Sequence, residues 1–131
     1  MIRIKVSCIG IVPPTQKYFF LADNIDEIIF YNTYEKIKAK INRGLRINLD
    51  ESIWLCCGYI IKEIRLGNNL NQIKEKISKL LSHDRVMMGV PEIMKKNNFE
   101  ITIEKKQFHI DIENLINPCN DSRTTSCNLD R

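Results

Sequence analysis

Hydrophobic and polar residues alternate at the start of the chain. Over residues 2–8 the apolar side chains take every second position and polar side chains lie between them: Ile2, Ile4, Val6 and Cys8 against Arg3, Lys5 and Ser7. Because successive side chains of a strand point to opposite faces, this pattern predicts a half-buried β-strand. Pro13 and Pro14 end the pattern. We expect residues 15–23 to form a connection, and this connection carries an aromatic cluster made of Tyr18, Phe19 and Phe20.

The periodicity changes to that of a helix after this connection. Asn24, with Glu27 three residues later, has the pattern of a capping box and is the expected helix start. Apolar residues then recur at spacings of three and four, which places them on one helix face: Phe30, Tyr34, Ile37 and Ile41. Gly44 follows at a position where helices are commonly ended by a glycine with positive φ. The pattern therefore predicts a helix from Asn24 to just before Gly44.

A second helix is predicted from about Asp50 to Leu66. Asn48 and Glu51 repeat the capping-box pattern before it, and Gly67 follows its end. Its middle is apolar nearly all round, with Ile53, Trp54, Leu55, Cys56, Cys57, Tyr59, Ile60, Ile61 and Ile64. Such a helix is expected at the centre of the fold, covered on several sides. Because glycine inside a helix costs about 1 kcal/mol relative to alanine, Gly58 indicates that a neighbouring group approaches closely there.

A third helix is expected to begin at Asn69, which has Gln72 three residues later. Its apolar face is formed by Leu70, Ile73, Ile77, Leu80 and Leu81. This spacing again indicates one amphipathic helix that packs against a core.

The next segment, "DRVMMGVPEIM" at residues 84–94, is apolar but contains Gly89 and Pro91. Proline lacks the amide hydrogen and restricts the residue before it, so the segment cannot be one uninterrupted helix. We predict a helical turn through Arg85–Met88, capped by Ser82 and ended by Gly89 with positive φ. A second turn is expected to begin at Pro91 and reach Met94. The methionines are expected to fill irregular gaps against the larger helices.

The C-terminal part has the pattern of a hairpin followed by a polar tail. Residues 99–103 and 108–112 alternate between apolar and polar side chains, and Lys105-Lys106 is the expected tip. The predicted architecture is α+β: a small helical bundle, a C-terminal β-hairpin and an added N-terminal strand. The chain accordingly divides into an N-terminal extension (1–23), a main domain (24–116) and a polar tail (117–131), for which we expect disorder.

Composition and charge narrow the class of protein. At 131 residues, with 44% hydrophobic and 27% charged residues, the chain is typical of a soluble globular protein. Its net charge is +4, but basic residues are mixed with acidic ones, which favours a solvated surface over nucleic-acid binding. No stretch approaches the roughly 18 apolar residues of a membrane span, and no signal-peptide cleavage pattern follows the first residues. We expect a cytoplasmic protein that binds neither membranes nor nucleic acid.

The five cysteines do not predict a disulfide framework, because their number is odd and no secretion signal accompanies them. Cys56 and Cys57 lie side by side in the predicted central helix and are expected to be small buried hydrophobic residues. Cys119 and Cys127 lie in the polar tail without a nearby histidine or a C-x-x-C spacing, so a zinc site there has little support.

The sequence shows no catalytic motif. His83 and His109 fall in a loop and on a strand without metal-ligand spacing, and we interpret His109 as a surface histidine. A glycine-rich phosphate loop, a nucleophile elbow and an H-E-x-x-H pattern are all missing from the sequence. The residues alone therefore predict a small domain without catalytic, cofactor-binding or metal-binding residues of its own.

Three stretches of the chain resemble the gamma subunit of urease. They are "RGLRIN" at residues 43–48, "VMMGVPEIM" at residues 86–94 and "FEITI" at residues 99–103. The corresponding stretches in that family typically read RGLKLN, VMxGVPEM and VEATF, and the intervals fit without gaps over residues 26–116. The resemblance covers most of the chain and leaves the N-terminal residues as an extension.

This resemblance implies a structural subunit of a nickel-dependent, urea-hydrolysing assembly with beta-like and alpha-like chains, usually in a threefold arrangement. In that family the nickel ligands lie on the alpha subunit, and the resemblance implies the same for the partner of this chain. No residue of this chain matches a catalytic or nickel-binding position of the family. The residues expected to form a subunit interface or structural motif are Arg43, Gly44, Asn48, Val86, Met87, Gly89, Val90, Pro91, Glu92 and Met94. The alternatives that remain are a stand-alone interaction or regulatory module with the same fold and, with less support, nucleic-acid binding through the lysine-rich helices.

Overall fold

The computed structural model describes residues 1–117 of the chain. In chain order its elements are β1 (Ile2–Cys8), β2 (Thr15–Leu21), α1 (Asn24–Asn42), α2 (Leu49–Arg65), α3 (Leu70–Ile77), a 3-10 helix (His83–Arg85), α4 (Val90–Ile93), β3 (Lys96–Ile103) and β4 (Lys106–Glu113). The fold is of the predicted α+β class, with β3 and β4 as the C-terminal hairpin. Among these elements no helix is long and apolar enough to cross a membrane.

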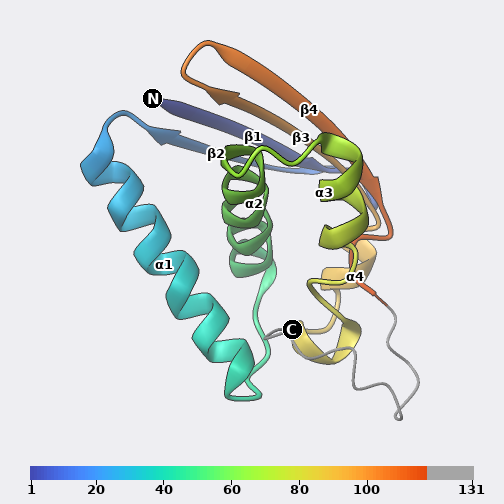
Figure 1. Ribbon diagram of the computed structural model, residues 1–131. Helices are drawn as coiled ribbons and strands as arrows, with labels where there is room; N and C mark the ends of the chain where they lie inside the picture. Colours follow the sequence, from blue (N-terminus) through green and yellow to red (C-terminus); the bar gives the residue numbers. More distant parts are fainter. Residues whose placement is uncertain (118–131) are drawn as a thin grey trace.

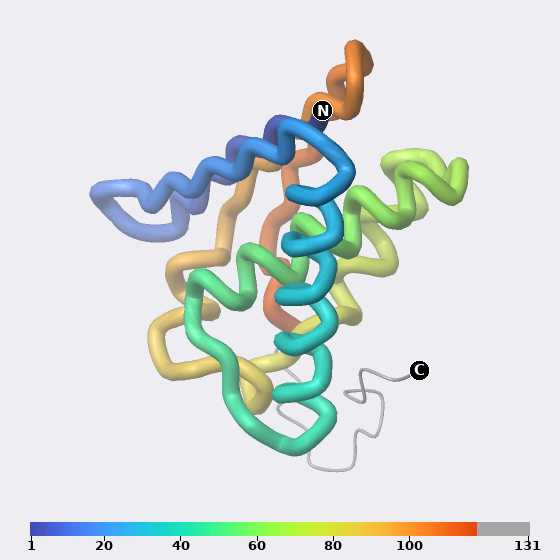
Figure 2. Tube along the Cα trace, turned by 90° about the vertical axis from the view of Figure 1, so that its left-hand side faces the viewer, coloured from blue at the N-terminus to red at the C-terminus, as the bar shows by residue number. Residues whose placement is uncertain are grey.

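The four strands form one antiparallel sheet in the order β2-β1-β3-β4. Helices α1, α2 and α3 lie together on one face of this sheet (Figure 1). Figure 2 turns the molecule so that α1 and the β2 side of the sheet face the viewer. The fold is therefore a two-layer arrangement in which the sheet has one covered face.

The predicted N-terminal strand, β1, lies inside the sheet between β2 and β3. Ile4 of β1 is paired with Phe19 on one side and with Ile101 on the other. The alternating apolar residues of β1 are all buried: Ile2, Ile4, Val6 and Cys8. The segment that the sequence marks as an extension is thus part of the hydrophobic core.

The prediction that residues 15–23 form a connection is wrong for most of that segment, because Thr15–Leu21 form strand β2. The side chains of Tyr18 and Phe20 are exposed on one face, while Phe19 packs against the core on the other. Three consecutive aromatic residues show no apolar–polar alternation, so the pattern test failed here. Aromatic residues nevertheless favour strands, and that propensity was the signal available in the sequence.

Helix α2 is the centre of the fold, as its apolar composition predicts. Its buried residues are Ser52, Ile53, Leu55, Cys56, Cys57, Gly58, Ile60 and Ile61. The predicted close approach at Gly58 is confirmed, because a Cβ added there would lie 2.4 Å from Cδ1 of the Tyr34 ring. Gly58 therefore lets α1 and α2 pack with the Tyr34 ring between them.

An aromatic cluster joins α1, α2 and strand β2. The ring of Phe30 is stacked on that of Trp54, with centroids 5.1 Å apart. Phe19 meets both rings edge-on, at 5.4 Å from Phe30 and 5.0 Å from Trp54. Trp54 Nε1 also donates a hydrogen bond to the backbone oxygen of Phe30 at 3.0 Å, so the indole amine is satisfied where the ring is partly buried.

The predicted helix ends are largely confirmed. Asn48 with Glu51 and Asn69 with Gln72 each form a complete capping box, at the starts of α2 and α3. Gly44 follows α1 with φ +82°, and it donates its backbone N–H to the Ile41 oxygen at 2.9 Å. Gly67 follows α2 with φ +90° and the equivalent bond, to Ile64 at 3.0 Å. Glycines at these positions satisfy the last carbonyls of both helices.

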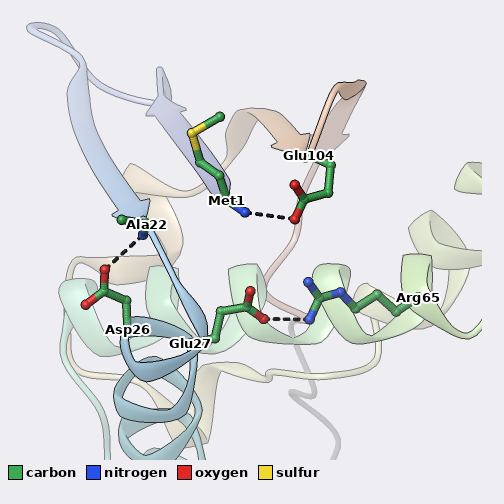
Figure 3. A network of polar contacts seen from close by, with 6 residues as sticks. All are labelled: Met1, Ala22, Asp26, Glu27, Arg65 and Glu104. Carbon is green, nitrogen blue, oxygen red and sulfur yellow. Dashed lines mark hydrogen bonds and ion pairs between the residues drawn. The ribbon is translucent and has the colours of Figure 1, made fainter.

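The start of α1 differs by one residue from the prediction, because Asp23 and not Asn24 is the N-cap. The Asp23 side chain accepts a hydrogen bond from the backbone N of Asp26 at 3.0 Å. Glu27, the expected partner in a capping box, instead forms an ion pair with Arg65 of α2 at 2.7 Å (Figure 3). Aspartate and asparagine are equally good N-caps, so the sequence alone does not separate these two positions. The ion pair ties the first turn of α1 to the last turn of α2.

The tip of the β3–β4 hairpin is Glu104-Lys105, one residue before the predicted tip. Glu104 has φ +55°. Its side chain pairs with the N-terminal ammonium of Met1 at 2.8 Å, and its backbone N donates to the Met1 oxygen at 2.8 Å (Figure 3). The hydrogen bond from this ammonium holds the pKa of the Glu104 carboxyl below its usual value. These contacts fasten the beginning of β1 to the hairpin.

Two further boundaries differ from the predictions. Helix α3 ends at Ile77, before Leu80 and Leu81, although Leu81 is buried as expected. Strand β3 begins at Lys96, three residues earlier than Phe99. Asn117, assigned to the tail, pairs with Ser82 in an isolated bridge, and the rest of the predicted tail lies outside the described residues.

We expect Gly58→Ala to destabilise the protein by about 1–3 kcal/mol, because the added methyl group forces the buried Tyr34 ring to move. In a Tyr34→Ala background the same substitution should instead stabilise by about 1 kcal/mol, the normal helix preference for alanine. Urea unfolding of the four variants in this cycle measures both effects. Equal effects of Gly58→Ala in the two backgrounds would show that Tyr34 does not cause the constraint.

Candidate functional site

The structure brings together two of the motif stretches that are far apart in the sequence, residues 43–48 and residues 86–94. The backbone N of Ile47 donates to the oxygen of Arg85 at 3.0 Å, and the N of Met87 donates to the oxygen of Ile47 at 2.9 Å. Together these bonds form an isolated parallel bridge between Ile47 and Val86. We call the surface formed by residues 43–48 and 86–94 the motif surface.

The first stretch of the motif surface is held by the two helices that it connects. Arg43 is the C-cap of α1, and Gly44 turns the chain with a positive φ. Asn48 then caps α2. The Glu51 side chain accepts from the Asn48 backbone N at 3.0 Å and from Lys40 Nζ of α1 at 2.6 Å. The six-residue connection between α1 and α2 is therefore constrained at both ends.

The ionisation of Glu51 reflects this arrangement. Burial alone would raise the pKa of the Glu51 carboxyl, but hydrogen bonds from Lys40 and Asn48 outweigh burial. The pKa consequently lies below its usual value, and the carboxylate is charged at neutral pH. The Lys40–Glu51 pair thus holds the end of α1 to the start of α2.

The second stretch of the motif surface differs from the prediction in its first half. The helical turn expected at Arg85–Met88 is wrong: the turn is a 3-10 helix at His83–Arg85, and Val86 is extended with φ −122° and ψ 158°. The Ser82 side chain does not cap this turn. Val86 is extended because it takes part in the bridge to Ile47, which local sequence rules do not detect.

The second half of this stretch agrees with the prediction. Gly89 has φ +93° and lies between the two turns, and Val90–Ile93 form the short helix α4, with Pro91 as its second residue rather than its first. Val86, Val90 and Met94 are buried. The motif thus places one apolar side of the segment in the core.

Of the three methionines in this stretch, only Met94 fills a gap in the core as predicted. Met94 is fully buried, whereas Met87 is exposed and Met88 is 99% exposed. The prediction that Met87 and Met88 fill gaps in the core is therefore wrong. The bridge at Val86 and the positive φ of Gly89 turn these two side chains outward.

The back of α4 is fixed to the sheet. Gly10, just after β1, donates its N–H to the Ile93 oxygen at 3.3 Å, and a Cβ added to Gly10 would lie 2.2 Å from the Glu92 oxygen. The buried Asn97 side chain donates to the backbone oxygens of Met94 at 2.7 Å and Ile112 at 3.1 Å. These contacts leave the segment around Gly89 little freedom to move away from the domain.

The outward side of the motif surface carries apolar and cationic side chains. Leu45 precedes the bridge and Met87 and Met88 follow it, and all three are exposed. Arg43 and Arg46 are exposed beside Leu45 in sequence. Methionine and arginine are enriched in protein–protein interfaces, whereas isolated exposed apolar residues are common anywhere. The arrangement is suited to contact with another protein. Leu45 and Arg46 were not among the predicted interface residues, although both lie within the first quoted motif.

The remaining candidate groups do not form a reactive site in the part of the chain that the structure describes. Cys8, Cys56 and Cys57 are buried, as predicted for the last two. Burial raises the pKa of the Cys8 thiol to about 11, and burial also raises the pKa values of the Cys56 and Cys57 thiols above their usual value. These thiols are therefore protonated at neutral pH and unsuited to act as nucleophiles or metal ligands.

The histidines and the other possible metal ligands likewise form no reactive site among the described residues. His83 is exposed, and His109 is exposed on the sheet with its Nε2 3.4 Å from an Asp111 carboxylate oxygen. Within residues 1–117, no group of three or more His, Cys, Asp and Glu side chains is placed to hold a metal ion. Cys119 and Cys127 lie outside the described residues. The described side chains do not fit a nickel centre.

Comparison with known proteins finds similarity to urease gamma subunits. The family model for the urease gamma subunit matches residues 20–116. The chain is also 26% identical over 92 residues to the urease subunit gamma of Prochlorococcus marinus strain MIT 9312, covering 70% of this chain and 92% of that protein. It is 26% identical over 77 residues to the urease subunit gamma of Halalkalibacterium halodurans, covering 59% of this chain and 77% of that protein.

The chain is an α+β domain in which the two motif stretches lie side by side, and its described residues contain no group of His, Cys, Asp and Glu that could hold a metal ion. Because the family model spans most of the chain, the protein belongs to the urease gamma-subunit family. The match begins at residue 20, so β1 and residues 15–19 of β2 lie before it.

We expect Gly89→Val to lower the free energy of unfolding by about 1–2 kcal/mol, because a β-branched residue is strained at positive φ. A Cβ at Gly89 meets no atom within 4 Å, so the cost comes from the backbone and not from a clash. Gly89→Asn is the matched control and should cost less, since asparagine tolerates this conformation better. Thermal unfolding of the three proteins tests this, and equal midpoints would show that the positive φ is not needed.

Proposed function

We propose that this chain is a structural subunit of a nickel-dependent urease, the enzyme that hydrolyses urea to ammonia and carbamate. In this proposal the chain supplies no catalytic residue and docks on beta-like and alpha-like partner chains through the motif surface. The nickel ions are held by the alpha-like partner, and the assembly is a threefold hetero-oligomer in the cytoplasm. Membership of the urease gamma-subunit family supports this proposal.

The observation that carries the proposal is the construction of the motif surface. Two family motifs meet through the Ile47–Val86 bridge, and their buried residues fix the exposed side chains of Met87 and Met88. A side chain as exposed as Met88 contributes nothing to the core of this domain, whereas a partner pocket could bury it. Burying a methionine side chain contributes about 1.5–3 kcal/mol, enough to make it an anchor of an interface.

A second candidate is a stand-alone interaction or regulatory module that keeps the fold but has a different partner. The N-terminal hairpin supports this alternative, because β1 and most of β2 lie outside the family match, and these two strands form half of the sheet. Such a change in the sheet could replace a contact made by other family members. The two candidates differ in whether urease beta-like and alpha-like chains bind.

The test is co-expression of the tagged chain with the urease beta-like and alpha-like chains of its own source organism, followed by purification through the tag. We expect all three chains to co-purify, and Met88→Lys to reduce recovery of the partners about tenfold, as for loss of an interface anchor. Leu66→Lys is the matched control, because Leu66 is 74% exposed and lies just beyond the other end of α2. Both substitutions lie on exposed side chains and should leave the thermal midpoint unchanged.

Three results would contradict the proposal. They are failure of the partners to co-purify with the unaltered chain, equal recovery with both variants, and urea hydrolysis by the purified chain alone. The first result, together with capture of a different protein by the motif surface, would favour the stand-alone module.

A further inference from the structure

A second apolar surface lies away from the motif surface, at the free edge of the sheet. Strand β2 is the terminal strand in the order β2-β1-β3-β4, so one side of its backbone has no strand partner among the described residues. In Figure 2 this strand and α1 lie at the front of the molecule. An edge strand with free backbone groups is a template for pairing with another strand.

Aromatic side chains occupy the centre of this edge. Tyr18 is 62% exposed and Phe20 is 56% exposed, both on the open face of the sheet. Ile29 of α1 is also exposed and lines the same shallow hollow as Tyr18 and Phe20. Ile25 and Ile28 continue the exposed apolar surface along the first turns of α1. Natural proteins usually protect an edge strand with charges, proline or a bulge, whereas this one has aromatic residues at its centre.

The charges near the edge are already engaged within the chain. Lys17 lies 3.7 Å from Asp50, and Glu27 pairs with Arg65 at 2.7 Å. Asp23 and Asp26 accept backbone hydrogen bonds at the start of α1. The remaining charged groups against the edge, Arg3 and Lys5, lie over the rings of Phe20 and Tyr18. Positive and negative groups are therefore mixed around this edge, which favours neither a strongly acidic nor a strongly basic partner. The edge fits a partner that is itself largely apolar.

We propose that β2 pairs antiparallel with β2 of a second copy of this chain, about a twofold axis that passes through Tyr18. This pairing would join the two sheets into one continuous sheet of eight strands. Tyr18 would lie opposite Tyr18 of the second copy, and Phe20 opposite Gln16. The inference concerns a different surface from the motif surface and does not rest on the proposed urease assembly.

The register of the two β2 strands follows from the charge of Lys17 and from the length over which the two strands overlap. A pairing centred on Lys17 places two like charges directly opposite each other, which is unfavourable. A pairing centred on Phe19 leaves Thr15 and Gln16 without partners in the other strand. The pairing centred on Tyr18 uses the whole of Thr15–Leu21 and places each Lys17 opposite a Phe19 ring. In the single chain Lys17 already lies 5.7 Å from the centroid of the Phe19 ring, so the two side chains are compatible neighbours.

A second copy is favoured over another strand because of where the edge lies in the sequence. Residues 15–19 of β2 precede the part of the chain that matches the urease gamma-subunit family. We therefore do not expect this edge to be a surface on which partners of the relatives bind. A second copy necessarily carries the same aromatic strand, in which Lys17 is the one charged residue.

Cysteine cross-linking tests the register. We would replace Tyr18 or Gln16 by cysteine in a chain that also carries Cys119→Ser and Cys127→Ser, and oxidise each protein with diamide. Residues directly opposite in an antiparallel pair have Cα atoms about 4.5–5.5 Å apart, which a disulfide can bridge. The two Gln16 residues would be offset by four positions, about 14 Å along the strand, and out of reach. The other cysteines, Cys8, Cys56 and Cys57, are buried and should not react.

We expect Tyr18→Cys to give at least tenfold more disulfide-linked dimer than Gln16→Cys on a non-reducing gel. Light scattering of the unaltered full chain should give twice its mass of 15.4 kDa at micromolar concentration. Phe20→Lys should give the monomer mass, with an unchanged circular dichroism spectrum, because Phe20 is largely exposed. Met88→Lys is the matched control and should remain dimeric, since Met88 belongs to the motif surface.

A monomeric unaltered chain would overturn the proposal. So would a dimer that persists in Phe20→Lys, or equal cross-linking of the two cysteine variants. Met88→Lys should keep the dimer in this test but lose the partner chains in the co-purification test. Failure of the dimer can therefore be distinguished from failure of the urease assembly.

Discussion

Two backbone hydrogen bonds, from Ile47 to Arg85 and from Met87 to Ile47, join parts of the chain that are separated by the whole of α2 and α3. They hold Val86 in an extended conformation and thereby direct the segment that follows. Val90 and Met94 then enter the core, while Met87 and Met88 point away from it. Without this bridge, the connection after α1 and the turn at Gly89 would be two independent loops. With it, they form one surface of defined shape, which is what a subunit contact requires.

Local features of the fold could be predicted from the sequence because their causes are local. The capping residues Asn48 and Asn69 each act on a backbone group three residues away, and Gly44 closes the helix directly before it. The buried side of α2 follows from its composition, and Gly58 correctly indicated a close neighbour, which proved to be Tyr34. The family resemblance added the two motif stretches that the structure later placed side by side.

The features that sequence reasoning missed depend on partners distant in the chain. Strand β2 exists because β1 offers it an edge, and the run Tyr18-Phe19-Phe20 contains no alternation that would reveal this. The outward position of Met88 depends on a backbone bridge, and backbone hydrogen bonds place no demand on residue type. The contact of Gly10 with α4 is similar, because only the folded chain shows that a side chain there would meet the Glu92 oxygen. In each case the structure depends on a contact between distant parts of the chain, and the conformational preference of the residues themselves does not reveal that contact.

The N-terminal hairpin changes how the family domain meets its surroundings. β1 occupies the edge of β3 that would otherwise be free, so the exposed edge of the sheet moves to β2. The motif surface lies where α1 ends and α2 begins, and it includes α4, which directly precedes β3 (Figure 1). The motif surface and the β2 edge have different exposed residues, Met88 on the first and Tyr18 and Phe20 on the second. A substitution in one of these surfaces need not disturb the other.

The central claim is that the bridge makes the motif surface a fixed part of the folded domain. Residue-resolved hydrogen exchange of the Ile47 and Met87 amides in the full chain tests this claim most directly. We predict that both amides exchange as slowly as the buried amides of α2, such as that of Ile60, because their bonds break only when the domain unfolds. Exchange of these two amides as fast as that of Lys105, at the exposed tip of the hairpin, would contradict the account.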